Sequence, residues 1–182
     1  MSLKYLVAAI ALVVLAGCAG STAPSPADAF MDALAQLCGR TFNGRLVTTD
    51  PADADFAGKK LAMGEVRCGP DEIAIPFAVG KNRSRTWAIT RTATGVRLKH
   101  IHRHDDGTED AVSRYGGATT APGTAARQEF PADDFSKQLF AANKLERSLT
   151  NVWAVEVVPG KLFAYELRRP NRFFRVEFDL SK

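Results

Sequence analysis

The last part of the chain alternates apolar and polar residues with a period of two, which is the pattern of half-buried β-strands. On the final segment the apolar face holds Phe174, Val176, Phe178 and Leu180. The segments 152–158 and 161–168 alternate in the same way. Three such strands in succession predict an apolar sheet face that must be covered by the rest of the chain.

The same period begins at residue 41, so the chain is predicted to be mostly β. Turn signals such as Thr94-Gly95, Asp106-Gly107 and Pro159-Gly160 join neighbouring segments, and such short links favour antiparallel pairing. Pro76 predicts an edge or a bulge, because proline cannot donate to a ladder. The predicted strands are 42–48, 60–68, 73–79, 84–92, 96–104, 110–115, 152–158, 161–168 and 172–180.

Two helices accompany these strands. Ser25-Pro26 is typical of a helix start, apolar residues follow at helical spacing as far as Cys38, and Gly39 is a stop signal. A second, short helix is predicted near 132–142, and the small residues of 116–126 predict a loop. The predicted fold class is therefore all-β: an antiparallel barrel or sandwich of about nine strands with an N-terminal helix and one short helix.

The first eighteen residues have the pattern of a bacterial lipoprotein signal. Lys4 precedes an unbroken apolar run over 5–15, which is too short to span a bilayer comfortably. The run ends in Leu15-Ala16-Gly17-Cys18, which resembles the lipobox of bacterial lipoproteins. The resemblance implies cleavage before Cys18, a diacylglyceryl thioether on its sulfur and acylation of its new amine. The alternative is an ordinary secretory signal with an incidental cysteine.

Cleavage there divides the chain into three parts: a signal peptide (1–17), an acylated cysteine with a short tether (18–25), and a single β-rich domain (26–182). Several acyl chains, at about 0.8 kcal/mol per buried CH2, make a strong membrane anchor. Ala19 stands where an aspartate is the usual inner-membrane retention signal of proteobacterial lipoproteins. In a Gram-negative host the resemblance therefore implies the outer membrane, with the domain facing the periplasm.

An oxidising compartment gives the two remaining cysteines a structural role. Cys38 and Cys68 form an even pair without the C-x-x-C spacing of a redox or metal site, so we expect them to form a disulfide.

The three histidines of the chain, His100, His102 and His104, stand on one face of one predicted strand. Adjacent members lie about 7 Å apart at Cα, a spacing at which two imidazoles can share a divalent metal such as zinc. With the turn centred on the Asp-Gly dipeptide, Glu109 lies opposite His104, and a one-residue bulge brings Asp110 there instead. Together these residues would make a metal or ligand site, and the alternative is a polar hairpin tip.

Five arginines fall in the same predicted hairpin: Arg83, Arg85, Arg91, Arg97 and Arg103. They indicate either a solvated face or a surface patch for lipid headgroups, lipopolysaccharide or polyanions. A nucleic-acid partner is not expected, because no RNA- or DNA-binding motif accompanies the net charge of +4 and the implied address is periplasmic.

The sequence carries no motif of a known catalytic class, such as G-x-S-x-G, S-x-x-K, H-E-x-x-H or a Walker loop. The order of helix and strands resembles lipocalin-like barrels, although the segment after the helix reads Thr41-Phe42-Asn43-Gly44 and lacks a Gly-x-Trp. We therefore expect a non-enzymatic lipoprotein without a cofactor that binds a small or amphiphilic ligand or an envelope component. The alternatives are a metal-binding protein or metallo-hydrolase built on the three histidines, and a purely structural envelope protein.

Overall fold

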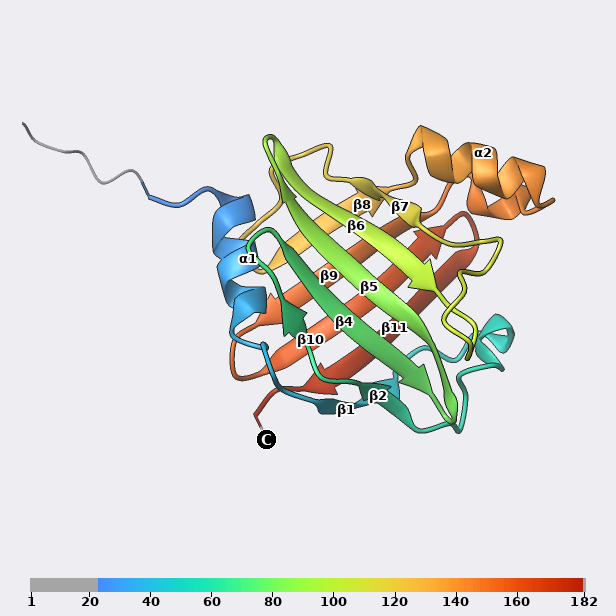
Figure 1. The fold of residues 1–182 in the computed structure, drawn as a ribbon, viewed down its shortest axis with the longest axis horizontal. Helices are drawn as coiled ribbons and strands as arrows, with labels where there is room; N and C mark the ends of the chain where they lie inside the picture. The colour runs from blue at the N-terminus through green and yellow to red at the C-terminus, as the bar shows by residue number, and fades with distance from the viewer. Residues whose placement is uncertain (1–22, 182) are drawn as a thin grey trace, which may run out of the picture.

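The computed structural model describes residues 23–181 as a single antiparallel sheet that curls into a nearly closed barrel (Figure 1). The strands are β1 (Phe42–Leu46), β2 (Leu61–Met63), β3 (Arg67–Cys68), β4 (Glu72–Val79), β5 (Asn82–Thr92), β6 (Gly95–His102), β7 (Tyr115–Ala118), β8 (Arg127–Pro131), β9 (Val152–Val158), β10 (Leu162–Arg169) and β11 (Arg172–Asp179). The helices are α1 (Pro26–Ala35) and α2 (Asp134–Ala142), with 3-10 turns η1 (Pro51–Asp53) and η2 (Glu146–Ser148). The predicted all-β fold is confirmed, whereas Cys18 and the signal peptide lie outside the described residues.

The sheet runs in the order β7-β6-β5-β4-β2-β1-β11-β10-β9-β8, and β3 pairs with β4 beside this path. The two ends of the path meet where the Asp133 N–H donates to the Gly116 carbonyl at 2.9 Å. The Ser136 hydroxyl accepts from the Gly116 N–H at 2.7 Å. A Cβ on Gly117 would lie 1.8 Å from the Pro131 carbonyl oxygen, so only glycine permits this close approach.

The predicted strand over 60–68 is two strands in the structure. β2 ends at Met63, and the Gly64 N–H donates to the Pro76 carbonyl at 2.8 Å. Pro76 has no N–H to return, so the ladder breaks here and resumes as β3. The register between β4 and β5 shifts just beyond, between Phe77 and Val79, which confirms the irregularity predicted from the proline.

The predicted strand over 110–115 was wrong. Asp110 Oδ1 accepts from the Val112 N–H at 2.8 Å, and Ser113 Oγ accepts from the His102 N–H at 3.0 Å. These side chains satisfy backbone donors that a strand would have paired with backbone carbonyls.

The predicted loop over 116–126 was also wrong in its first residues, which belong to β7. The glycines of β7 do not produce the alternating hydrophobic pattern of a strand. They are present because β7 approaches its neighbours too closely for a side chain. β8 was missed altogether, since one of its two buried residues is the polar Gln128 beside Phe130.

Helix α1 lies across one end of the barrel, whereas α2 lies on the side where β7 and β8 meet (Figure 1). Ser25 Oγ accepts from the Asp28 N–H at 3.1 Å, which confirms the predicted N-cap. Phe30 and Leu34 are fully buried against the strands. No helix within residues 23–181 is long and apolar enough to cross a membrane.

The predicted disulfide is present. Cys38, just after α1, is bonded to Cys68 of β3 with the two Cα atoms 5.9 Å apart. It fastens the helix that covers one barrel end to the wall of the barrel.

The interior of the barrel is rich in aromatic rings. The predicted inward face of the last strand is confirmed, because its four apolar residues are at most 4% exposed. Trp87 stacks on Tyr165 with ring centroids 4.4 Å apart, and Phe77 stacks on Trp87 at 4.6 Å. Helices α1 and α2 and the long strands share this single core.

Candidate functional site

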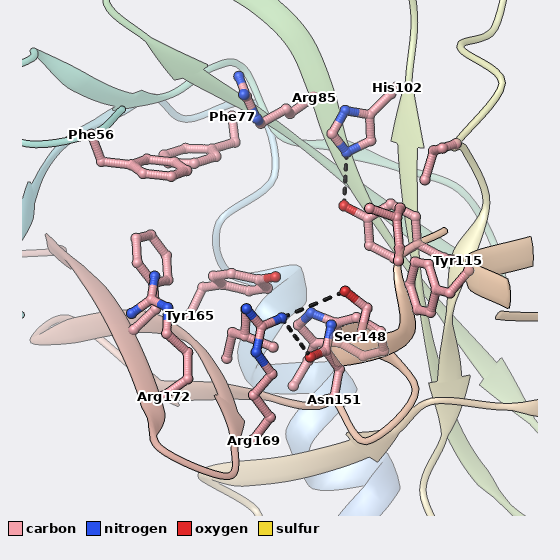
Figure 2. Close-up of a pocket in the computed structure, with 16 residues that line it drawn as sticks. Phe56, Phe77, Arg85, His102, Tyr115, Ser148, Asn151, Tyr165, Arg169 and Arg172 are labelled. Carbon is pink, nitrogen blue, oxygen red and sulfur yellow. Dashed lines mark hydrogen bonds between the residues drawn. The ribbon is translucent and has the colours of Figure 1, made fainter. Parts of the chain in front are cut away.

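The barrel holds a cavity of about 260 Å3 at the end away from α1 (Figure 2). Its position follows from β5, since Arg91 contacts Asp28 of α1 whereas Arg85, nearer the start of the strand, lines the cavity. The aromatic residues that line it are Phe56, Phe77, Tyr115, Phe140, Trp153, Tyr165 and Phe174.

The charged groups that line the cavity are all cationic or titrate to a cation. They are Arg85, His102, Arg169 and Arg172, and the neutral Ser148 and Asn151 lie beside them. No Asp or Glu lines it among the described residues. The cavity therefore combines an aromatic interior with a positive electrostatic potential at its mouth.

Strand alternation explains this arrangement. Along each of four strands the inward face is apolar or aromatic and ends, at the same end of the barrel, in a basic residue. The pairs of inward neighbours are Arg85 with Trp87, His102 with His100, Arg169 with Leu167, and Arg172 with Phe174.

The guanidinium groups differ in what neutralises them. Arg172 is ion-paired with the buried Asp53 and lies 3.6 Å from Asp50. Arg169 instead donates to neutral oxygens, at 3.3 Å to Asn151 Oδ1 and 3.5 Å to Ser148 Oγ (Figure 2).

Arg85 also has only neutral partners. It donates to Asn82 Oδ1 at 3.0 Å, and its guanidinium lies 5.8 Å from the centre of the Phe56 ring. Within residues 23–181, no carboxylate lies at ion-pair distance from Arg85 or Arg169, so both keep an unneutralised charge.

His100 is buried beneath the cavity. Its Nδ1–H donates to the Tyr115 carbonyl at 3.1 Å, so its Nε2 accepts from the Tyr165 hydroxyl at 2.8 Å. Burial lowers the pKa of His100 to about 3 and raises the pKa of Tyr115 to about 12. Both side chains are therefore neutral at physiological pH.

His102 is half-buried at the cavity wall. Its Nε2 lies 3.0 Å from the Tyr115 hydroxyl, and burial, followed by the charge of Arg85, lowers the pKa of His102. The fixed charge of the cavity at neutral pH thus comes from its arginines alone.

His100 and His102 share one face of β6, as predicted, whereas the strand ends at His102 and leaves His104 beyond it. His100 is buried, His102 is half-buried and His104 is exposed. The expectation that Glu109 lies opposite His104 was wrong, because the bridge pairs Glu109 with Arg103. The reason is a turn centred one position earlier, closed by the Gly107 N–H on the His104 carbonyl at 3.0 Å.

Neither acidic candidate reaches His104 directly. Glu109 forms ion pairs with Arg103 and Arg114 at 2.8 and 2.6 Å, and Asp110 holds the Val112 N–H. Within residues 23–181, no three His, Cys, Asp or Glu side chains converge as a metal would require. Both nitrogens of His100 are engaged in hydrogen bonds, so zinc binding stays a prediction that this arrangement does not favour.

The five arginines of the predicted hairpin do not form one face. Arg91 pairs with Asp28 and Asp32 of α1, Arg85 points into the cavity, and Arg97 and Arg103 are exposed. The interpretation as a single solvated or lipid-binding face was therefore wrong for Arg85 and Arg91.

The aromatic cavity itself was missed, together with Arg169 and Arg172. The alternation of the last two long strands could have revealed them. When the inward-facing series of each strand is continued by one more inward residue, it reaches these arginines. That extension places a basic residue next to Leu167 on one strand and next to Phe174 on the other.

Comparison of the chain with known protein families, with curated proteins and with solved structures finds no match in any of the three.

Proposed function

We propose that this protein is a lipid-anchored, periplasm-facing protein of the outer membrane that binds a small or amphiphilic ligand in its barrel. The observation that carries the proposal is the cavity of about 260 Å3 lined by seven aromatic residues, with a few polar groups at its mouth. A concave, mostly apolar site with a small number of placed polar groups is the usual form of a small-molecule site.

The positions of the tether and the cavity at opposite ends of the barrel are consistent with a membrane-anchored ligand-binding protein. The proposed tether joins the barrel at α1 (Figure 1), whereas the cavity lies at the other end. A ligand would therefore enter from the side that faces away from the membrane holding the anchor.

Ligand binding is tested with N-phenyl-1-naphthylamine, an uncharged fluorophore that brightens in apolar surroundings. We expect saturable binding to the chain secreted from Ala19 onward, which keeps the single core whole. Val112→Trp narrows the cavity and should weaken binding at least about tenfold, because the tryptophan occupies the space of the probe. Val47→Trp, at an exposed site away from the cavity, is the matched control. Equal binding by the two variants would place the site elsewhere.

Anchoring is tested on the full-length chain. We expect incorporation of a labelled fatty acid and recovery in the outer-membrane fraction, with loss of both in Cys18→Ala. Ala19→Asp should move the protein to the inner membrane. Unchanged labelling of Cys18→Ala would refute the lipoprotein assignment.

A further inference from the structure

We infer that the ligand is an anionic amphiphile whose carboxylate or phosphate is held by Arg169 while its apolar body lies among the rings. The inference rests on the proposed function and specifies its ligand class. It is carried by the Arg169 guanidinium, whose hydrogen-bond partners within residues 23–181 are neutral oxygens, in the wall of an aromatic cavity that no acidic residue of the described chain lines.

The first step is that Arg169 forms no ion pair within residues 23–181. Its neighbour Arg172 has two acidic partners, Asp50 and Asp53. Among the described residues, Arg169 donates only to the amide oxygen of Asn151 and the hydroxyl of Ser148, both at 3.3 Å or more. A guanidinium forms its strongest hydrogen bonds with a carboxylate or phosphate, so an anion would improve on these neutral contacts.

The second step is the local electrostatic field. Burial, and then the charges of Arg172 and Arg147, lower the pKa of Arg169, and the charge of Asp50 offsets only part of this shift. An arginine stays protonated in proteins despite such a shift. Its charge is therefore held in a partly desolvated place beside two like charges, and a bound anion would offset that repulsion.

The third step is that Arg169 and Arg172 line both the cavity and the solvent-exposed surface next to it. A surface pocket beside the cavity shares Arg169 and Arg172 with it and adds Arg147, with Asp50 as its one acidic residue among the described ones. An acidic headgroup at Arg169 would thus sit at the boundary, with solvent on one side and the aromatic lining, including Tyr165, on the other (Figure 2).

The fourth step is size. A cavity of about 260 Å3 has room for about eight or nine groups of roughly 30 Å3, the volume of one water molecule. An eight-carbon chain is therefore a suitable probe. Octanol, octanoate and octyl phosphate share this chain and differ only in the headgroup.

The experiment measures displacement of N-phenyl-1-naphthylamine from the chain secreted from Ala19 onward. We expect octanoate or octyl phosphate to displace the fluorophore at concentrations at least about tenfold lower than octanol, as expected for hydrogen bonds to a charged group. Whichever acid competes better identifies a carboxylate or a phosphate as the preferred headgroup.

Variants assign the effect to the named residue. Arg169→Gln should reduce the advantage of the acid to about threefold or less, whereas Arg169→Lys should keep most of it because the charge remains. Arg168→Gln is the matched control, since Arg168 is the exposed neighbour that pairs with Glu129 on the outer face. It removes one positive charge from the protein without touching the cavity.

Two outcomes would overturn the inference. If octanol competes as well as the acids, the anionic assignment is wrong while the proposed function stands. If the acids are preferred but Arg168→Gln weakens them as much as Arg169→Gln, the preference reflects overall charge and not this site. Failure of the fluorophore and of every octyl compound to bind would instead refute the proposed function itself.

Discussion

Arg169 and Arg172 lie directly opposite each other in the β10–β11 pair, and both line the inside of the barrel mouth. Like charges directly opposite in an antiparallel pair are destabilising. The aspartates of η1 and its N-cap form ion pairs with Arg172 and not, among the described residues, with Arg169, which the charge of Asp50 stabilises only at longer range. The fold therefore keeps an unfavourable charge at Arg169, which is the pattern expected where stability is reduced for the sake of binding.

The first prediction concerns this charge. Arg169→Gln should raise the free energy of unfolding by about 0.2–1 kcal/mol without ligand, because it removes the cross-strand repulsion. Urea unfolding followed by circular dichroism measures the change. Arg168→Gln, which loses only an exposed ion pair, should leave stability within about 0.5 kcal/mol. A loss of more than 1 kcal/mol in Arg169→Gln would mean that its contacts to Ser148 and Asn151 are structural.

The second prediction concerns the partner of Arg172. Asp53 is 1% exposed, accepts from the Thr48 hydroxyl at 2.6 Å and is ion-paired with Arg172. Asp53→Ala should lower the free energy of unfolding by about 3–5 kcal/mol, since it leaves a largely buried guanidinium without its closest partner.

The control for this change is Asp55→Ala, at an exposed position of the same segment, which should alter stability by no more than about 0.5 kcal/mol. Equal effects of the two variants in urea unfolding would refute a structural role for the Asp53–Arg172 pair.

The third prediction concerns the disulfide. Cys38→Ala/Cys68→Ala opens a loop with a sequence separation of 30 residues, and the chain-entropy model expects a loss of about 3–4 kcal/mol. Reduction of the wild-type protein with dithiothreitol should lower the free energy of unfolding by the same amount. The double variant should not respond to the reductant, and a response would point to another reducible group.

The disulfide and the barrel were predictable because both follow from regular signals. Strict alternation over 172–180 indicates which side of the strand is buried. An even pair of cysteines in an oxidising compartment indicates a disulfide bond. Signals of this kind need no knowledge of tertiary contacts.

The parts that failed depend on contacts between distant residues. Gly116 and Gly117 resemble loop residues in sequence, but they close the barrel against Leu98 and Pro131. The His104 register depended on a turn whose centre differs by one position, and a one-residue slip exchanges every cross-strand partner. The cavity exists because several inward faces meet at one barrel end, which no single strand pattern reveals.

The last prediction concerns pH. The pKa of His100 is about 3 in the folded protein, against about 6.5 in an unfolded chain. Between these values the unfolded state binds the extra proton, so stability is fully present above pH 6.5 and falls as the pH is lowered toward 3. The expected slope from this one residue is about 1.4 kcal/mol per pH unit.

His100→Gln removes the titrating group, so its free energy of unfolding should decline less steeply than that of the wild type between pH 6 and pH 4. Urea unfolding at several pH values gives both slopes. His104→Gln changes an exposed histidine just beyond the same strand and should retain the wild-type slope. Parallel slopes for wild type and His100→Gln would show that the buried imidazole is not the group whose protonation opposes folding, and would place that role on His102 or on the carboxylates.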